Sequence, residues 1–387
     1  MRNVLRCIIS KLVICMGINM KVYQKKAACC GCGACMEICP KQAIRMVQDQ
    51  EGFLYPKVEK SRCIHCGKCG EICPMRKKGK ISDENLYMGA QAKDGQLRYS
   101  GSSGGIFSVL AQYILAHQGI VYGAGYDEAM KVIHKGVEDQ KRLDQIKRTK
   151  YVQSNMEGIY GRIEKNLKEN RWVLFCGTPC QAEALMKYLD QSYEKLLVVD
   201  LVCYGVPSPG IWKDYVTYLE QIHKGKMTDF SFRDKRNRDN GHIRSCIIGG
   251  KEYAVSLYQD LYCRMYFKNY ILRPSCHVCR FCTVDRRSDL TIGDFWGIEN
   301  VRREMDDGMG TSMIIVRSEK AKRIWKEIEQ DLIWFSCDKA DVLQPRLQQP
   351  TDMARGRYAF MLLYRMLPFR LLAGLLEGRH MFQRKTK

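Results

Sequence analysis

Two closely spaced runs of cysteines near the start of the chain constrain its fold more than any other feature. The runs are Cys29-x2-Cys32-x2-Cys35-x3-Cys39 and Cys63-x2-Cys66-x2-Cys69-x3-Cys73, and a proline follows each of them. Gaps of two residues let three thiolates surround one face of a cubane iron–sulfur cluster. The fourth thiolate, three residues further on, points away from that cluster, so each run is predicted to contribute to two clusters.

This spacing is typical of a bacterial-type ferredoxin domain with two 4Fe-4S clusters. We therefore predict one cluster on Cys29, Cys32, Cys35 and Cys73, and a second on Cys63, Cys66, Cys69 and Cys39. Gly31, Gly33 and Gly67 allow the backbone amides to approach the cluster sulfurs. Two zinc sites are the alternative, because zinc needs only four such ligands. Zinc does not explain two complete runs of four that each end in Cys-Pro.

The cysteine count also indicates the compartment. Twenty cysteines in 387 residues fit a secreted disulfide framework poorly, because such frameworks belong to small domains. We expect metal binding in a reducing compartment, the cytoplasm. We also expect residues 1–23 to be an N-terminal extension, with Met20 as the suspected native start.

A third cysteine cluster is Cys276-x2-Cys279-x2-Cys282. Three thiolates are one short of a 4Fe-4S site. Cys180 and Cys203 each follow a predicted strand, where the loops of an α/β sheet gather at a site, and either one is a candidate fourth ligand. A zinc site or free thiols are the alternatives.

The chain after the second run alternates strands and helices. Strands are predicted at 86–92, 120–126, 131–137, 172–176, 196–203 and 311–316, and helices at 105–117, 157–170, 179–189, 208–223, 257–270 and 319–332. Residues 227–255 favour antiparallel strands. The fold class expected is mixed α/β, with a small ferredoxin-like dicluster domain followed by a larger α/β domain.

The domain boundaries follow from these patterns. We predict the dicluster domain at 24–80, ending in a linker of charged residues, and the large domain at 84–340. Residues 341–387 are predicted to be a basic amphipathic tail. Its apolar stretch 357–376 is predicted to dock on the protein, and peripheral contact with a membrane is the alternative.

Several short motifs of the large domain occur in an order that resembles a known family. They are Ser102-Ser103-Gly104-Gly105, Lys150-Tyr151-Val152-Gln153-Ser154, Phe175-Cys176-Gly177-Thr178-Pro179-Cys180-Gln181, 200–205, 231–235, and Gly293-Asp294-Phe295-Trp296-Gly297 after the third cysteine cluster. In this order they resemble the beta subunit of coenzyme F420 hydrogenase/dehydrogenase, whose relatives include ferredoxin-dependent reductases of the chlorophyll pathway. The resemblance covers roughly residues 86–300.

The resemblance implies a flavin, FAD, next to a 4Fe-4S cluster. No Gly-x-Gly-x-x-Gly run follows a strand, so an ordinary Rossmann site is not indicated. The glycine-rich turn opens a helix, whose free amides suit a phosphate. An N-cap or a polar loop is the alternative for these residues. The candidate flavin contacts are Ser102, Ser103, Gly104, Gly105, Lys150, Gln153, Ser154, Gly177, Thr178, Pro179 and Gln181.

The charge of the chain bears on its partners. The formal net charge is +21, yet no nucleic-acid-binding motif accompanies it. We expect an acidic redox partner such as a ferredoxin, or an anionic substrate, with a solvated basic surface as the alternative. The basic run 233–238 is expected to be a solvated loop, and binding of an anionic substrate tail is its alternative.

These observations favour an enzyme, an iron–sulfur flavoprotein oxidoreductase. It would pass electrons between ferredoxin, or a deazaflavin coenzyme, and an unknown small-molecule substrate. Clusters carry single electrons, whereas a flavin stores one or two. A non-catalytic electron-transfer subunit of a larger complex is the second hypothesis. A structural protein with degenerate cofactor sites is the third, and the intact cysteine runs argue against it.

Overall fold

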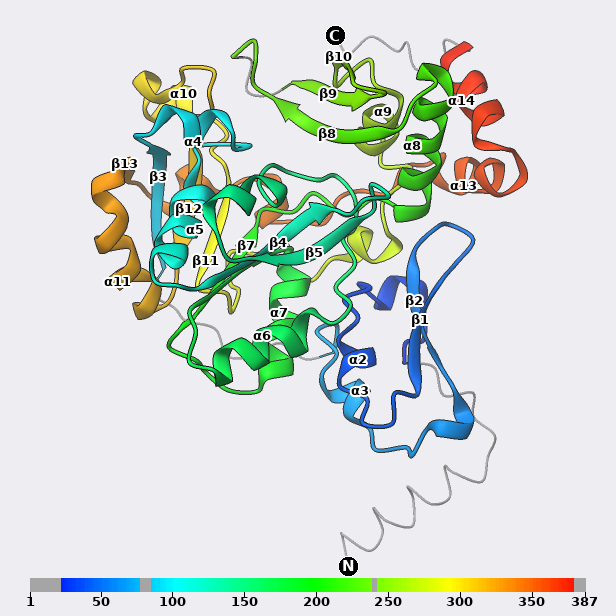
Figure 1. The fold of residues 1–387 in the computed structure, drawn as a ribbon, viewed down its shortest axis with the longest axis horizontal. Helices are drawn as coiled ribbons and strands as arrows, with labels where there is room; N and C mark the ends of the chain where they lie inside the picture. Colours follow the sequence, from blue (N-terminus) through cyan, green and yellow to red (C-terminus); the bar gives the residue numbers. More distant parts are fainter. Residues whose placement is uncertain (1–21, 77–84, 239–241, 379–387) are drawn as a thin grey trace, which may run out of the picture.

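The computed structural model describes residues 22–76, 85–238 and 242–378, and its first part is a small cysteine-rich unit (Figure 1). Strands β1 (Ile44–Gln48) and β2 (Leu54–Val58) form an antiparallel hairpin. One short 3-10 helix and one short α-helix flank each side of it: η1 (Lys26–Ala28), α2 (Ala34–Glu37), η2 (Lys60–Arg62) and α3 (Lys68–Glu71). The expected extension and most of the expected linker lie outside the described residues.

A mixed eight-stranded sheet organises the large unit, in the order β13-β3-β12-β11-β7-β6-β4-β5. Its inner strands β11 (Leu290–Asp294), β7 (Leu196–Leu201), β6 (Val173–Gly177) and β4 (Ile120–Tyr126) run parallel. Strands β12 (Ser312–Val316), β13 (Leu332–Ser336) and β5 (Val132–Val137) run antiparallel to their neighbours, and β3 (Leu86–Ala92) pairs with β12 and β13.

Helices cover both faces of this sheet, because its inner strands are apolar on both sides. Helices α5 (Ile106–Ala116) and α11 (Glu319–Ile328) share one apolar core with the sheet. Helices α6 (Ile159–Lys168) and α7 (Pro179–Leu189) share the core on the opposite face. Short segments complete this unit: α4 (Gly95–Tyr99), η3 (Gln140–Gln145), η4 (Pro274–Val278), α10 (Ile298–Val301), η5 (Arg303–Met305), η6 (Glu329–Asp331), α12 (Lys339–Val342) and η7 (Pro345–Leu347).

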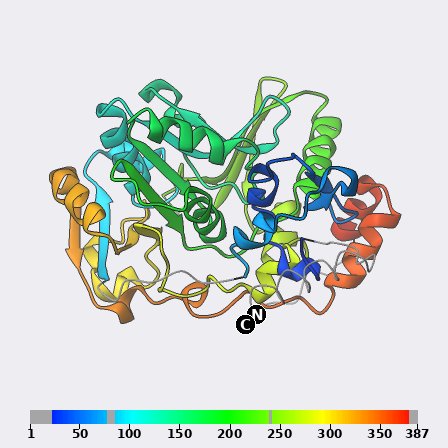
Figure 2. The same cartoon turned by 90° about the horizontal axis from the view of Figure 1, so that it is seen from below.

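A second, three-stranded sheet, β10-β9-β8, packs with four helices around a core rich in aromatic side chains. Its strands are β8 (Met227–Asp234), β9 (Ile243–Ile248) and β10 (Lys251–Ser256), and its helices are α8 (Pro209–His223), α9 (Leu261–Phe267), α13 (Arg357–Met366) and α14 (Phe369–Gly378). Figure 2 shows the cysteine-rich unit beside α13 and α14. The expected tail therefore docks on the protein over its described part.

The mixed α/β class with a small N-terminal unit is confirmed, and most predicted elements match to within two residues. Some expectations were wrong. The helix predicted at 319–332 ends at Ile328, because Leu332 begins β13. Strand β11 was not predicted. The helix predicted at 257–270 is only α9. The domain boundaries at 24–80, 84–340 and 341–387 stay predictions.

The basic run 233–238 is not wholly the solvated loop we expected. Arg233 and Asp234 end strand β8, and Arg233 forms an ion pair with Asp294 at 2.6 Å. Lys235 is only 2% exposed. The tertiary packing of β8 against the end of β11 overrides the polar composition of this run.

No helix among the described residues is long and apolar enough to cross a membrane.

Candidate functional site

The two cysteine runs fold in the same way locally. A 3-10 helix precedes each run, and a glycine with left-handed backbone follows the second cysteine of each: Gly33 at φ 79° and Gly67 at φ 79°. Each glycine is the N-cap of a short helix that carries the third cysteine. A residue with a side chain is strained at this φ, so the glycines allow both turns to form.

The first predicted ligand set surrounds one cavity. Cys29, Cys32, Cys35 and Cys73 all line it, although Cys73 comes from the second run. Burial and the neighbouring thiols raise the pKa of Cys35 to about 12. Buried thiols this close together ionise only if a cation compensates them, so the donor set fits a cluster of metal ions.

The second predicted ligand set also converges. Burial, followed by the charges of Cys63, Cys66 and Cys39, raises the pKa of the Cys69 thiol. Cys39 belongs to the first run, so the crossing of the fourth cysteine occurs here as well. The amide of Ala43 donates to Cys39 Sγ at 3.2 Å, the kind of N–H···S contact that tunes a cluster.

The two sets differ in exposure. In the first run Cys30, Cys32 and Cys35 are 6%, 8% and 9% exposed. In the second run Cys66 is exposed, and Ile64, which matches Cys30 in position, is 55% exposed. The first set therefore faces the large unit, and the second set faces solvent.

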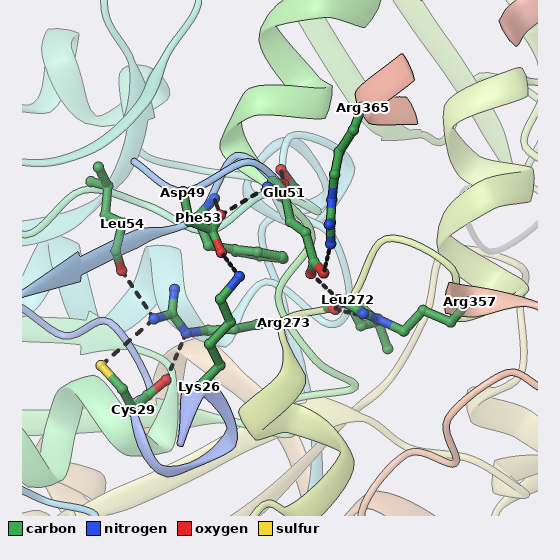
Figure 3. Close-up of polar contacts among 11 residues, drawn as sticks. Lys26, Cys29, Asp49, Glu51, Phe53, Leu54, Leu272, Arg273, Arg357 and Arg365 are labelled. Atoms are coloured by element: carbon green, nitrogen blue, oxygen red, sulfur yellow. Dashed lines mark hydrogen bonds and ion pairs between the residues drawn. The ribbon is translucent and has the colours of Figure 1, made fainter. Parts of the chain in front are cut away.

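Arg273 of the large unit forms hydrogen bonds with the first run and with β2 (Figure 3). Its Nε donates to the carbonyl of Cys29 at 2.8 Å, and its Nη2 donates to Cys29 Sγ at 3.6 Å and to the carbonyl of Leu54 at 3.0 Å. Gly31 lies against the same guanidinium, since a Cβ there would come within 2.7 Å of Nη1. Only glycine fits this close approach.

A buried ion-pair group holds the tip of the β1–β2 hairpin. Arg357 Nη2 donates to Glu51 Oε2 at 2.7 Å, and Arg365 Nη2 to Glu51 Oε1 at 3.1 Å. The hydroxyl of Ser208 donates to the carbonyl of Glu51 at 2.6 Å. Glu51 and Arg357 are 5% and 2% exposed, so their pair is shielded from water, whereas Arg365 is partly exposed.

The third cysteine cluster lies next to both candidate fourth ligands. Burial raises the pKa of Cys203 well above its usual value, and the charges of Cys276, Cys180 and Cys279 add to this. The charge of Cys203 also acts on Cys282. The five thiols therefore form one group at the carboxyl end of the parallel strands.

Cys180 has further partners. Its thiol and that of Cys30 are close enough to act on each other's pKa, and Thr178 Oγ1 lies 3.2 Å from Cys180 Sγ. Cys30 thus connects the first cysteine run to the third cluster, a contact that no sequence pattern indicated.

The predicted glycine-rich turn lies where β3 leads into α5. The hydroxyl of Ser102 accepts from the amide of Thr149 at 2.6 Å, and that of Ser103 donates to the carbonyl of Thr311 at 3.0 Å. Gly104 packs on β3, because a Cβ there would lie 2.4 Å from the carbonyl oxygen of Ala90. Gly105 is the left-handed N-cap of α5.

The remaining polar candidates form an internal network. The hydroxyl of Ser154 lies 2.8 Å from His134 Nδ1 and accepts from Gln181 Nε2 at 2.9 Å. Gln181 also closes a capping box with Thr178, next to Gly177 and Pro179 at the start of α7. These groups are satisfied within the protein, so they shape the site rather than offer free donors.

Gln153 lies at the junction of the two units, and its predicted contact with a flavin stays a prediction. Its Nε2 donates to the carbonyl of Cys30 at 2.8 Å, and its Oε1 accepts from Arg273 at 2.9 Å. Both ends of the amide are therefore engaged at the junction of the two units.

Two lysines stand out by their electrostatics. Burial of its amine lowers the pKa of Lys150 to about 7, and among the described residues this lysine forms no ion pair. Burial likewise lowers the pKa of Lys235 to about 7, and its amine donates to the carbonyls of Arg98 and Ser103. Lys150 was predicted, whereas Lys235 was missed because its sequence neighbours are polar.

His134, Glu51 and Arg273 were also missed. Burial lowers the pKa of His134 to about 4, so it is neutral at ordinary pH. No sequence signal marks any of them, since their partners are 20 to 306 residues away along the chain.

Within the described ranges no group of three or more Cys, His, Asp or Glu side chains is placed to hold a single metal ion.

Comparison with known proteins places two regions of the chain in families. Residues 28–77 match the 4Fe-4S dicluster domain. Residues 170–337 match the family described as the C terminus of the coenzyme F420 hydrogenase/dehydrogenase beta subunit. No curated protein matches the sequence.

Among solved structures, the chain is similar to one from the F420-reducing NiFe hydrogenase complex of Methanosarcina barkeri. The identity is 16% and the TM-score 0.43, over 79% of this chain and 95% of that one. Residues 28–77 are therefore identified as a 4Fe-4S dicluster domain, and residues 170–337 are similar to the C terminus of the coenzyme F420 hydrogenase/dehydrogenase beta subunit, which makes the chain an iron–sulfur redox protein.

Proposed function

We propose that the chain is an iron–sulfur flavoprotein oxidoreductase. It exchanges electrons with an acidic redox protein, a ferredoxin, and passes them to or from a small-molecule substrate or a deazaflavin coenzyme. One observation carries the proposal: the two thiol sets have unequal exposure, with one toward solvent and one toward the large unit. Such an arrangement connects an external partner with an internal site. A reducing compartment, the cytoplasm, suits these free thiols.

Charge near the second cysteine run supports an acidic partner. The exposed basic side chains there are Lys57, Lys60, Arg62 and Lys68, against the acidic Glu59 and Glu71. A basic patch around an exposed cluster attracts an acidic protein and orients it for electron transfer.

A third 4Fe-4S cluster is proposed on Cys276, Cys279 and Cys282. Cys203 is the favoured fourth ligand, because its charge acts together with those of all three. The charge of Cys180 acts together with those of Cys276 and Cys279, and its thiol also neighbours Cys30 of the first run. Replacing Cys203 by Ala is expected to remove about four irons per chain, whereas Cys180→Ala keeps them. The opposite result would assign Cys180.

The flavin is proposed to bind at the carboxyl edge of the parallel strands, between the 102–105 turn, Lys150 and the 177–179 turn. Lys150 is half-buried, its amine donates to the carbonyl of Lys147, and it has no carboxylate partner among the described residues, so an anionic group would suit it. Replacing Lys150 by Met is expected to lower the flavin content, and replacing the exposed Lys141 by Met is the matched control. An unchanged flavin content in both variants would contradict this site.

The roles of the residues follow. A bound flavin supplies the change between one- and two-electron chemistry. Thr178 and Gln181 fix the turn before α7, and Lys235 fixes the 102–105 turn through the carbonyl of Ser103. The neutral His134 holds Ser154 in place. These contacts shape the edge of the sheet and exclude water from it.

Iron and flavin content after anaerobic purification tests the proposal. About twelve irons and one flavin per chain are expected, with reduction of both by reduced ferredoxin. About eight irons without flavin would overturn the flavoenzyme and leave a two-cluster carrier.

The second candidate is a non-catalytic electron-transfer subunit. A specific observation favours it: Tyr358, Leu362, Met366 and Leu371 on α13 and α14 are between 54% and 71% exposed. An exposed apolar surface of this kind is typical of a subunit interface. A redox partner that co-purifies, together with no substrate turnover by the isolated chain, would support this alternative.

A further inference from the structure

The surroundings of Arg273 carry an inference about the first cluster, which rests on the proposed ligands. Arg273 is fully buried, at 0% exposure, and lies three residues before Cys276. Its guanidinium carbon stands 4.2 Å from the ring centroid of Tyr55, in a cation–π arrangement. It thus lies between the first cysteine run and the third cluster.

The partners of this guanidinium leave its charge uncompensated by a carboxylate. In the described part of the chain its hydrogen bonds go to the carbonyls of Cys29 and Leu54, to the amide oxygen of Gln153 and to Cys29 Sγ. A buried cation without a counter-charge costs several kcal/mol. The anion available to Arg273 is therefore the thiolate of Cys29 with whatever cluster it binds.

We propose that Arg273 is the positioning residue that raises the reduction potential of the first cluster above that of the second. A reduced cluster carries one more negative charge than an oxidised one, and a nearby buried cation stabilises the reduced form. Hydrogen bonds to the sulfurs act in the same direction. When one electron moves from the second cluster to the first, the second is oxidised and the first is reduced by one electron.

In the described part of the chain no buried cation contacts the second run: Arg76, whose charge acts on Cys69, is exposed. His65, which matches Gly31 in position, is also exposed, whereas Gly31 lies against Arg273 and Gln153. The charge comes from the large unit, so the potential of the first cluster depends on how the two units dock. Electrons that enter at the exposed cluster then collect at the buried one.

A redox titration followed by electron paramagnetic resonance tests the proposal on the full chain. Arg273→Met is expected to lower the reduction potential of the first cluster. The equilibrium constant for one-electron transfer between the clusters should move at least tenfold toward the second cluster, a shift of about 59 mV. Arg273→Lys keeps the charge and should shift it less. A Cys69→Ala chain, without the second cluster, identifies which potential belongs to the first.

Gln153→Glu is a second variant, which keeps Arg273 but neutralises it with a carboxylate, and it should lower the same potential. Arg45→Gln removes an exposed charge from the same unit and should change neither potential. Full iron content with unchanged potentials in Arg273→Met and Gln153→Glu would overturn the inference while the proposed function stands. A wild-type chain without two reducible N-terminal clusters would instead overturn the proposed function.

Discussion

The two cysteine runs have the same spacing and the same local fold, but opposite surroundings. Cys30 and Gly31 of the first run lie under the large unit, in contact with Cys180, Gln153 and Arg273. At the matching positions of the second run, Ile64 is 55% exposed and His65 is exposed. Identical ligand sets can therefore have different potentials and different partners, because solvent and buried charge are set by the environment.

Contacts of the β1–β2 hairpin keep the first run buried and the second run exposed. The β1–β2 hairpin is fastened at its turn through Glu51 and at the first residue of β2, Leu54, through Arg273, and both contacts reach the large unit. The small unit therefore docks in one orientation, with the exposed second run at the end of the unit away from the hairpin tip (Figure 1).

Removal of a ligand gives the largest expected effect. Cys35→Ala should lose about four irons and all electron transfer into the large unit. Cys69→Ala should lose as many irons, yet keep a first cluster that a small chemical reductant still reduces. Iron analysis and stopped-flow reduction measure both. If ferredoxin and the chemical reductant reduced the two variants equally, the two clusters would not differ in their access to solvent and to the large unit.

The next effect concerns docking. Glu51→Gln leaves Arg357 buried without its full counter-charge, and we expect the free energy of unfolding to fall by about 3 kcal/mol. The control is Glu59→Gln, whose exposed pair with Arg62 spans 3.9 Å and is worth less than about 0.5 kcal/mol. Urea titration of cluster absorbance and tryptophan fluorescence measures both variants. An equal, small loss in both would mean that the hairpin tip does not fasten the unit.

A smaller effect is expected at the matched positions of the two runs. Gly31→Ala forces a side chain into a left-handed residue at φ 71° and against Arg273, which should cost about 2 kcal/mol. His65→Ala should stay within about 0.5 kcal/mol, because His65 is exposed. The same urea titration applies. A Gly31→Ala chain as stable as the wild type would contradict the close contact.

The smallest effect is on association. Lys60→Gln with Arg62→Gln should slow reduction by an acidic ferredoxin about threefold at low salt, and the difference should vanish at high salt. Lys251→Gln with Lys339→Gln, two exposed charges on the large unit, should have no such effect. Stopped-flow reduction rates, measured against ionic strength, compare the two double variants. Equal slowing in both of them would argue against docking of ferredoxin at the second run.

Much of the fold was predictable from local pattern. The strand at Leu86–Ala92 and the helix at Pro179–Leu189 coincide with their predictions, since each is a continuous apolar run or an amphipathic segment with a clear start. Strand β11 was missed, because it is only five residues long and follows a polar, cysteine-rich segment. Its pairing with β7 and β12 is what makes it a strand.

In the candidate site, too, some features were predictable from local pattern and others were not. The predicted ligand sets rest on spacing along the chain, and the structure brings each of them together. Gln153 was predicted as a flavin contact from its motif, and the structure adds a hydrogen bond from Arg273 that the motif does not indicate. Its role depends on a residue 120 positions away, and one sequence gives no sign of such a contact.

The sequence by itself determined the chemistry of the small unit, because thiolates separated by two or three residues reach a cluster whatever surrounds them. The tertiary structure alone decided which cysteine run is buried, which cation lies against Cys29 and which thiols neighbour Cys203. Burial and buried charge arise from residues far apart in the chain, and they act on potentials and ionisation only after the two units have packed together.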